Sequence, residues 1–178
     1  MNKEKEYFTD LYNQDFEYVY SYVYSRTAGN SQLTEDIVQD TFAAAWLSLG
    51  RFDRRSTSRT WFCSIAKNKL CEHYRRTIYR EKIELSTEEE LADYPDSADI
   101  EEAVIGNEMR ECLLEIMKKM NPTYSYVLIM KYMDGYSVKE IAKVIGRSAK
   151  AVDGIIQRAK VSFKREYTKL EGCDGKNE

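Results

Sequence analysis

The stretch that decides the fold is residues 136–165, which read YSVKEIAKVIGRSAKAVDGIIQRAKVSFKR. Ser137, with Glu140 three residues later, forms a capping box and predicts the start of a short helix. Gly146 predicts a turn, and Ser148 predicts the N-cap of a second, longer helix. Two helices joined by a short glycine-containing turn are typical of a DNA-binding helix-turn-helix. A plain helical hairpin is the alternative for this pattern.

The second helix of this stretch is predicted to have an apolar side and a basic side. Val152, Ile156, Ala159 and Phe163 recur at helical spacing, so they are predicted to be buried. A helix that enters the major groove needs polar and basic side chains on its opposite side. That side is predicted to carry Lys150, Gly154, Gln157, Arg158, Val161, Lys164 and Arg165. Replacing Arg158 or Lys164 is therefore predicted to weaken DNA binding.

The helix-turn-helix belongs to a larger predicted unit over residues 105–171, followed by a disordered tail at 172–178. An amphipathic helix runs up to about Met120. Asn121 is the predicted N-cap of the next helix and Pro122 its first residue, because proline suits that position. This helix is predicted to stop at Asp134-Gly135.

A second all-helical unit is predicted over residues 1–82. Its first helix, or helix pair, is broken at Gly29-Asn30, and Ser31 is the predicted N-cap of the next helix, which Gly50 ends. The spacing i, i+3, i+4, i+7 predicts that one exposed face of this helix carries Asp36, Gln39, Asp40 and Ala43.

A polar loop at residues 51–59 leads into a third predicted helix, over about residues 60–81. Helical spacing predicts that its buried side contains Phe62, Ile65, Ala66, Leu70 and either His73 or Tyr74. Its outward side is predicted to contain Ser64, Asn68, Cys71, Glu72 and Arg75.

The formal net charge of −3 hides a strong pattern along the chain. Basic residues dominate residues 51–82 and again 139–169, whereas residues 84–111 contain many acidic residues and only one basic residue, Arg110. Both basic blocks suit phosphate contacts, although ordinary solvated helices also carry such charge. The acidic block has little periodicity and one proline, so residues 83–104 are predicted to be a flexible linker.

Several other classes of protein are disfavoured. No long apolar run follows the charged N-terminus, which predicts a cytoplasmic protein without membrane insertion. Cys63, Cys71, Cys112 and Cys173 lack paired spacing and are predicted to be free thiols. Zinc binding by Cys63, Cys71 and His73 is disfavoured, and no metal or cofactor is expected. The sequence has no glycine-rich phosphate loop and only one histidine, so no enzyme is predicted.

The whole chain resembles the extracytoplasmic-function sigma factors, the smallest class of the family that directs bacterial RNA polymerase to promoters. The resemblance extends over about residues 11–167 and rests on the order and spacing of several segments. These segments are EDIVQDTF at 35–42 with Ala45-Trp46, RFD at 51–53, RTWF at 59–62, IAKN at 65–68, YMDGYS at 132–137 and EIA at 140–142. It implies an all-α fold with two small helical domains on either side of the acidic linker.

The resemblance also implies roles for residues of the first domain. Asp36, Gln39 and Asp40 would contact the largest polymerase subunit, or form an ordinary solvated face. A loop containing Phe52, Arg54, Arg55 and Ser56 would capture a flipped base of the minus-ten element, where opened DNA needs stacking and phosphate partners. Asn68 would stand near the minus-ten bases, with Lys67, Arg75 and Arg76 on phosphates. Trp61 would hold the opened strand, or be an ordinary core tryptophan.

In the second domain, the resemblance implies recognition of the minus-thirty-five element. The implied contact residues are Arg147, Ser148, Lys150, Asp153, Gly154, Gln157, Arg158 and Lys164. The chain departs from the common family pattern at Asp153 and Ile155, where many relatives carry a basic residue, so the base preference is open. The implied partners are core RNA polymerase, promoter DNA and an anti-sigma factor. A helix-turn-helix regulator that works without polymerase and a helical adaptor protein are the alternatives.

Overall fold

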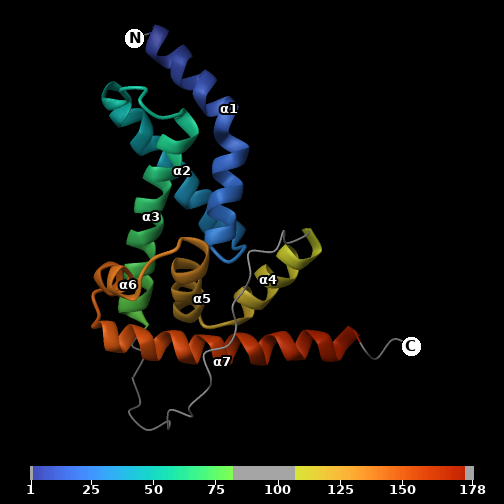
Figure 1. The fold of residues 1–178 in the computed structure, drawn as a ribbon. Coiled ribbons are helices and arrows are strands. Elements are labelled where there is room, and N and C mark those ends of the chain that lie inside the picture. The colour runs from blue at the N-terminus through green and yellow to red at the C-terminus, as the bar shows by residue number, and fades with distance from the viewer. Residues whose placement is uncertain (1, 82–106, 175–178) are drawn as a thin grey trace.

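The computed structural model describes residues 2–81 and 107–174, and every regular element in these ranges is helical, as the all-α prediction requires (Figure 1). The first part consists of three long helices that lie side by side. They are α1 (Asn2–Arg26), α2 (Ser31–Ser48) and α3 (Ser58–Arg80). A short 3₁₀ turn, η1 (Leu49–Arg51), follows α2.

Local signals explain where these helices begin and end, with two corrections to the sequence prediction. Of the two predicted alternatives, a helix or a helix pair, the structure has one continuous first helix, which begins at Asn2. The N-cap of α2 is Asn30 and not Ser31, because the Asn30 side chain accepts a hydrogen bond from the Leu33 backbone N–H at 3.0 Å. Gly50 does not end α2 abruptly, since the chain tightens into η1 first.

Aromatic side chains fill much of the core between α1, α2 and α3. The ring centroids of Phe42 and Phe62 are 4.9 Å apart, and those of Tyr12 and Phe42 are 4.6 Å apart. Edge-to-face packing at these distances adds to the stability gained by burying the rings. As predicted, the buried side of α3 includes Phe62, Ala66, Leu70 and Tyr74, whereas His73 and Ile65 are only half-buried.

The second part contains α4 (Asn107–Lys119), α5 (Pro122–Leu128), a π turn η2 (Ile129–Met133), α6 (Val138–Ile145) and α7 (Ala149–Asp174). The long helix α7 runs across the lower end of the molecule, and α4, α5 and α6 pack against it (Figure 1). Apolar side chains of α4, α5 and α7 form a satellite core that contains Ile116, Met120, Leu128 and Ala159.

The helix ends predicted in this second part are confirmed. Asn121 caps α5, with Pro122 as its first residue. The Glu140 N–H donates to the Ser137 Oγ at 3.3 Å, and the Ser137 N–H donates to the Glu140 carboxylate at 2.8 Å, so the capping box is complete. Gly146 has a φ of 68°, the left-handed conformation that glycine adopts most easily, and this conformation turns the chain from α6 into α7.

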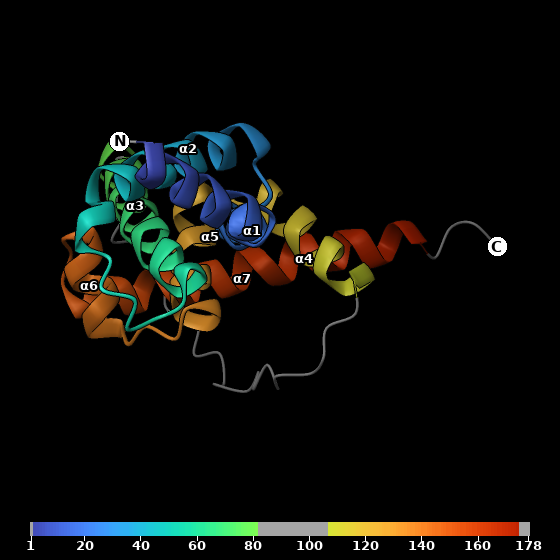
Figure 2. The same ribbon diagram turned by 90° about the horizontal axis from the view of Figure 1, so that it is seen from above.

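The two parts pack directly on each other, an arrangement that the sequence did not predict. The C-terminal half of α3 lies beside α5 and α6 (Figure 1), and Figure 2 shows α1, α2 and α3 lying over α5 and α7. One continuous hydrophobic core contains residues of both parts, among them Val19 in α1 and Ile156 in α7. The predicted linker at residues 83–104 lies outside the described residues. Residues 172–174 of the predicted tail belong to α7, which continues to Asp174, and the rest of that prediction lies outside the described residues. None of the described helices is both long and apolar enough to cross a membrane.

Candidate nucleic-acid and polymerase interface

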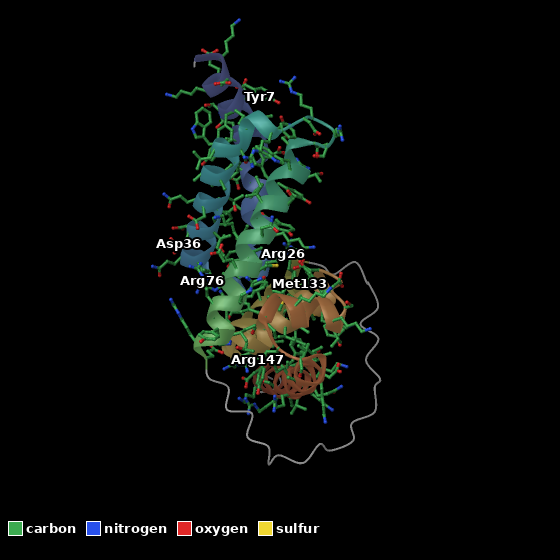
Figure 3. The ribbon with its side chains drawn as sticks, turned by 90° about the vertical axis from the view of Figure 1, so that its left-hand side faces the viewer. Tyr7, Arg26, Asp36, Arg76, Met133 and Arg147 are labelled. Atoms are coloured by element: carbon green, nitrogen blue, oxygen red, sulfur yellow. The ribbon has the colours of Figure 1, made fainter. Side chains whose placement is uncertain are left out.

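The exposed face of α2 carries the three residues predicted to contact polymerase. Asp36, Gln39 and Asp40 are all exposed on one side of the helix, and Figure 3 shows Asp36 at the outer edge of the molecule. Leu47 continues this stripe one turn beyond Ala43 and is 86% exposed. The sequence analysis missed Leu47, although it lies seven residues after Asp40 and therefore on the same face. We call Asp36, Gln39, Asp40, Ala43 and Leu47 the α2 stripe.

An aromatic pair lies where the loop after η1 meets α3. The rings of Phe52 and Trp61 are stacked, with centroids 4.6 Å apart and planes 19° apart. Both side chains are half-buried, and the Trp61 ring also contacts Phe62 at the edge of the core. The pair offers aromatic surface at the edge of the first part.

The loop beyond Phe52 presents arginines to solvent. Arg54 is exposed and has a φ of 60°, a left-handed conformation that is uncommon for residues other than glycine. Its guanidinium lies 4.8 Å from the centroid of the Tyr7 ring in α1, a cation–π contact that helps hold this loop. Arg55 pairs with Asp53 at 3.0 Å, and Ser56 is exposed nearby. Figure 3 shows Tyr7 at the end of the molecule far from α7.

The loop is tied to α1 by a buried carboxylate that the sequence analysis did not identify. Asp15 is only 1% exposed, and its carboxylate accepts hydrogen bonds from the Ser58 hydroxyl at 2.5 Å and from Arg59 Nε at 3.2 Å. These partners are the first two residues of α3. Asp15 therefore positions the start of α3, and with it the neighbouring loop.

The predicted DNA-binding residues of α3 divide into two neighbouring stripes. Asn68 and Arg76 lie eight residues apart on an exposed stripe, and Figure 3 shows Arg76 on the same side of the molecule as Asp36. Lys67, Cys71 and Arg75 form a second stripe that faces α6. We call this second set the covered stripe. Lys67 and Cys71 are half-buried, so Cys71 does not point outward as predicted. Arg75 lies at the edge of this stripe and is exposed, as predicted.

The covered stripe makes specific contacts with the helix-turn-helix. The Lys67 ammonium lies 4.5 Å from the centroid of the Tyr136 ring, and the Cys71 sulfur is 3.5 Å from the Tyr136 hydroxyl. Burial and the hydrogen bond with Cys71 raise the pKa of Tyr136, so the phenol stays protonated at neutral pH. Arg75 Nε donates to the backbone carbonyl of Val144 at 2.7 Å, near the end of α6.

In the helix-turn-helix, most of the residues predicted to contact DNA are exposed to solvent. Ser148 caps α7 as predicted, because its hydroxyl accepts a hydrogen bond from the Ala151 N–H at 3.2 Å. Gly154 is half-buried. The exposed predicted residues are Arg147, Ser148, Lys150, Asp153, Gln157 and Lys164. Figure 3 places Arg147 at the end of the molecule that contains α7.

Arg158 departs from its predicted place on the exposed side of α7. Its side chain is half-buried, and its Nε and Nη2 atoms are buried without a hydrogen-bond partner among the described residues. Helical spacing places Arg158 near the border between the buried and the exposed side of α7. For a residue at that border, the sequence pattern does not tell whether the side chain is buried or exposed. Unpaired donors of a guanidinium are costly to bury, so this side chain gains from any acceptor it reaches.

No group of three His, Cys, Asp or Glu side chains in the described ranges is close enough to hold a metal ion. The cysteines Cys63, Cys71 and Cys112 are free thiols, as predicted, and each is half-buried. Cys173 lies where no side chain is described.

Comparisons with known proteins agree with the geometry of both parts. Residues 11–77 match the family described as Sigma-70 region 2, and residues 110–162 match Sigma-70, region 4. The chain is 29% identical to the RNA polymerase sigma factor YlaC of Bacillus subtilis, over 94% of this chain and 95% of the relative. It is 33% identical to the RNA polymerase sigma factor CnrH of Cupriavidus metallidurans, over 72% of this chain and 70% of the relative.

Among solved structures, the chain is similar to the sigma factor RpoE in complex with the anti-sigma factor NepR from Bartonella quintana. That likeness covers 90% of this chain and 96% of the other, with 17% identity and a TM-score of 0.47.

Proposed function

The chain belongs to the extracytoplasmic-function sigma factors of bacterial RNA polymerase, and from this we propose how its surfaces direct polymerase to promoters. Residues 1–82 form the region that docks on polymerase and opens the minus-ten element. Residues 105–171 form the region that reads the minus-thirty-five element, and residues 83–104 connect the two. The matched ranges at 11–77 and 110–162 support this division.

The α2 stripe is the proposed docking surface for core polymerase, and its exposure is the observation that carries the proposal. Two carboxylates and an amide lie beside an almost fully exposed leucine, and no other part of the described chain covers them. A polar stripe that ends in an exposed apolar side chain has the mixed composition found in many protein–protein interfaces.

The aromatic pair and the neighbouring arginines are the proposed site for melted minus-ten DNA. A base that leaves the duplex needs an aromatic surface to stack on, and Phe52 and Trp61 supply one. Arg54 and Arg55 lie within the same loop, where they are placed to contact phosphates, with Ser56 beside them. Asn68 and Arg76 extend this surface along the exposed stripe of α3, and the covered stripe adds Lys67 and Arg75.

The start of α7 is the proposed reader of the minus-thirty-five element. Its exposed N-terminal residues have the placement that a recognition helix needs in the major groove. Asp153 is suited to accept a hydrogen bond from a cytosine amino group. Arg158 contributes only after its side chain turns outward, and its two unpaired nitrogens favour that change when a DNA acceptor is available.

The proposed mechanism is binding without catalysis by the chain itself, in the cytoplasm, where polymerase works. Neither DNA-binding surface needs high affinity alone, because polymerase holds both against one promoter and raises the effective concentration of each contact. We also propose an anti-sigma factor as a partner, since a solved relative is complexed with one.

Co-purification with core RNA polymerase tests the docking surface. We expect the full chain to bind core polymerase and the variant Asp36→Ala/Gln39→Ala/Asp40→Ala to bind at least about tenfold more weakly, because an interface loses most affinity when its central contacts are removed. Glu17→Ala, which removes an exposed carboxylate from α1, is the matched control and should bind normally. A wild-type chain that binds duplex DNA but never polymerase would instead identify a polymerase-independent regulator.

A further inference from the structure

We infer that Tyr7 is a positioning residue for the loop at residues 52–57, which we call the minus-ten loop. Its ring holds Arg54 in the left-handed conformation, so the loop keeps one shape before DNA arrives. The inference rests on the proposed function for the role of this loop in promoter opening. The contact between α1 and the loop is independent of that role.

The two ends of the minus-ten loop are fixed by contacts with residues close to them in the chain. At its start, the Phe52 ring stacks on Trp61 in α3. At its end, the Thr57 hydroxyl accepts a hydrogen bond from the Thr60 N–H at 3.2 Å and caps α3. Fixed ends still leave residues 53–56 several backbone conformations to choose from, so the ends alone do not select one.

Within the loop, Asp53 makes a local contact that is too exposed to fix the backbone by itself. Its carboxylate accepts a hydrogen bond from the Arg55 N–H at 3.1 Å and pairs with Arg55 Nε at 3.0 Å. The Asp53 and Arg55 side chains are 59% and 88% exposed, and ion pairs in solvent contribute little to stability. This contact turns the chain around Arg54 but does not tie the loop to a helix.

Arg54 is the residue of the loop that goes against its own backbone preference. Its φ of 60° is unfavourable for a residue with a side chain, and such a conformation persists only where surrounding contacts stabilise it. The guanidinium lies 4.8 Å from the centroid of the Tyr7 ring, within the range of a cation–π contact. Among the described residues, this is the one ring contact, hydrogen bond or ion pair that joins residues 53–56 to a helix.

The Tyr7 ring can act as an anchor because the first turns of α1 are packed on the core. The next residue, Phe8, lies edge-on to Trp46 of α2 and to Phe62 of α3, with ring centroids 5.2 and 6.1 Å away. Phe8 therefore fixes the helix, and Tyr7 is presented to the loop at the end of the molecule far from α7 (Figure 3). Tyr7 precedes the matched range that begins at residue 11, so the family match does not account for this contact.

A loop that already has its bound shape binds opened DNA more tightly, because no affinity is lost to ordering it. Arg54 stays exposed in this contact, so its guanidinium can reach a phosphate while the Tyr7 ring supports it. Removing the ring leaves the aromatic pair and the arginines in the chain but lets Arg54 leave the left-handed conformation. Tyr7 therefore acts on promoter opening through Arg54, without touching DNA itself.

Limited trypsin digestion of the free, full-length chain tests the anchoring contact without DNA or polymerase. Trypsin cuts after Arg54 and Arg55 faster as the loop becomes more flexible, and the bond after Arg147, in the exposed turn before α7, is the internal reference. We expect Tyr7→Ala to raise the rate of cleavage in the loop about threefold, the effect of losing one exposed cation–π contact, and to leave the reference rate unchanged. Tyr7→Phe keeps the ring and should be cut like the wild type. Equal loop cleavage in Tyr7→Ala and the wild type would overturn the inference.

Two more variants keep the digestion interpretable. Thr9→Ala, at an exposed position two residues along the same helix, is the matched control and should be cut like the wild type. If Tyr7→Ala raises the reference rate as well, the chain has lost its fold, and Tyr7→Leu decides the question. Leucine keeps apolar volume at this position but has no ring face for a cation, so we expect the loop rate to rise about threefold at an unchanged reference rate. No rise in that variant contradicts the inference.

Promoter opening then tests whether the anchor acts through Arg54. The assay is permanganate reactivity with core polymerase, on a promoter that the wild-type chain uses. We expect Tyr7→Ala to reduce opening about threefold at unchanged co-purification with polymerase, and Tyr7→Phe to open the promoter normally. In an Arg54→Gly chain, whose glycine adopts a φ of 60° without help from a ring, adding Tyr7→Ala should reduce opening no further. An equal loss in both backgrounds, or no loss in either, would overturn the inference.

Digestion and opening separate a failure of the anchor from a failure of the proposed function. A chain whose loop is cut faster in Tyr7→Ala, but whose wild type never binds polymerase, would refute the proposed function and leave the anchoring contact standing. A wild type that binds polymerase and opens promoters, with a loop that is cut no faster in Tyr7→Ala or Tyr7→Leu, would refute the anchor alone.

Discussion

Asp15 shows how one side chain can set the geometry of a functional loop. Its carboxylate is buried in α1 and accepts hydrogen bonds from both Ser58 and Arg59, the two residues that open α3. The Arg59 guanidinium also lies 4.3 Å from the centroid of the Tyr18 ring, which fixes the position of the arginine further. Because the loop with Phe52 and Arg54 ends at these residues, the position of Asp15 determines where the aromatic pair and the arginines lie.

Replacing Asp15 with alanine is expected to lower the free energy of unfolding by about 2–4 kcal/mol, because the Ser58 and Arg59 donors lose their buried acceptor. Urea unfolding followed by circular dichroism measures this change. Asp10→Ala, which removes an exposed carboxylate from the same helix, should have almost no effect. A loss below about 0.5 kcal/mol for Asp15→Ala would show that the buried carboxylate contributes little.

Phe52→Ala is expected to reduce promoter opening about tenfold without changing polymerase binding, because base–aromatic stacking contributes on the order of 1–3 kcal/mol per base. Permanganate reactivity of unpaired thymines measures opening on a promoter that the wild-type chain uses. Phe52→Tyr keeps an aromatic ring beside Trp61 and should open the promoter normally. Wild-type opening by Phe52→Ala would remove the aromatic pair from the proposed site.

Local sequence signals predicted the helices well because caps and turns depend on neighbouring residues. The capping box of α6, the cap and proline of α5 and the glycine turn at Gly146 all lie where the sequence placed them. The error at Ser31 is small, since Asn30 caps equally well one residue earlier. Contacts of Asp15 and Cys71 were not predictable, because their partners lie 43 and 65 residues away in the chain.

At the scale of elements, α3 explains why the candidate site was only partly predicted. Apolar residues at 62, 66, 70 and 74 predicted one buried side, but they did not reveal that the neighbouring side packs on another part of the chain. That second contact uses Lys67, Cys71 and Arg75. In a sequence pattern, residues of these types are equally consistent with a solvent-exposed face. Hydrophobic periodicity detects apolar burial and not polar contacts between distant elements.

The capping box gives a prediction for α6. Ser137→Ala is expected to lower the free energy of unfolding by about 1 kcal/mol, because the first turn of α6 loses its side-chain acceptor. Chemical denaturation measures this loss, and Ser64→Ala, at an exposed position within α3, is the control. The Ser137 hydrogen bonds also lower the pKa of Glu140, so the contribution of the box should disappear in acid as that carboxylate becomes protonated. Unchanged stability in Ser137→Ala would contradict this account of α6.

At the scale of the whole molecule, the packing of the two parts places the single histidine of the chain at their contact. His73 of α3 faces the Tyr126 hydroxyl of α5, with Thr77, Arg76 and Arg80 beside it on its own helix. Burial lowers the pKa of His73 from 6.5, and the two arginines lower it further. The packed molecule therefore favours a neutral imidazole.

Stability is expected to depend on pH through His73. The unfolded chain takes up the imidazole proton first as the pH falls through about 6.5, so stability is greatest above that value and decreases as the pH falls toward the lowered pKa. Urea unfolding at pH 7.5, 6.5 and 5.5 measures the decrease. His73→Gln keeps a polar partner for Tyr126 and should remove most of this dependence. A slope that persists in His73→Gln would assign the pH dependence to other groups.

In vitro transcription with purified core RNA polymerase and genomic fragments tests the central claim most directly. The account predicts that adding the chain creates discrete new start sites that core polymerase alone does not use. The same reactions with the triple substitution in the α2 stripe should lose those start sites. Transcripts that are identical with and without the wild-type chain, at concentrations where the chain is folded and in excess over polymerase, would contradict its role in promoter selection.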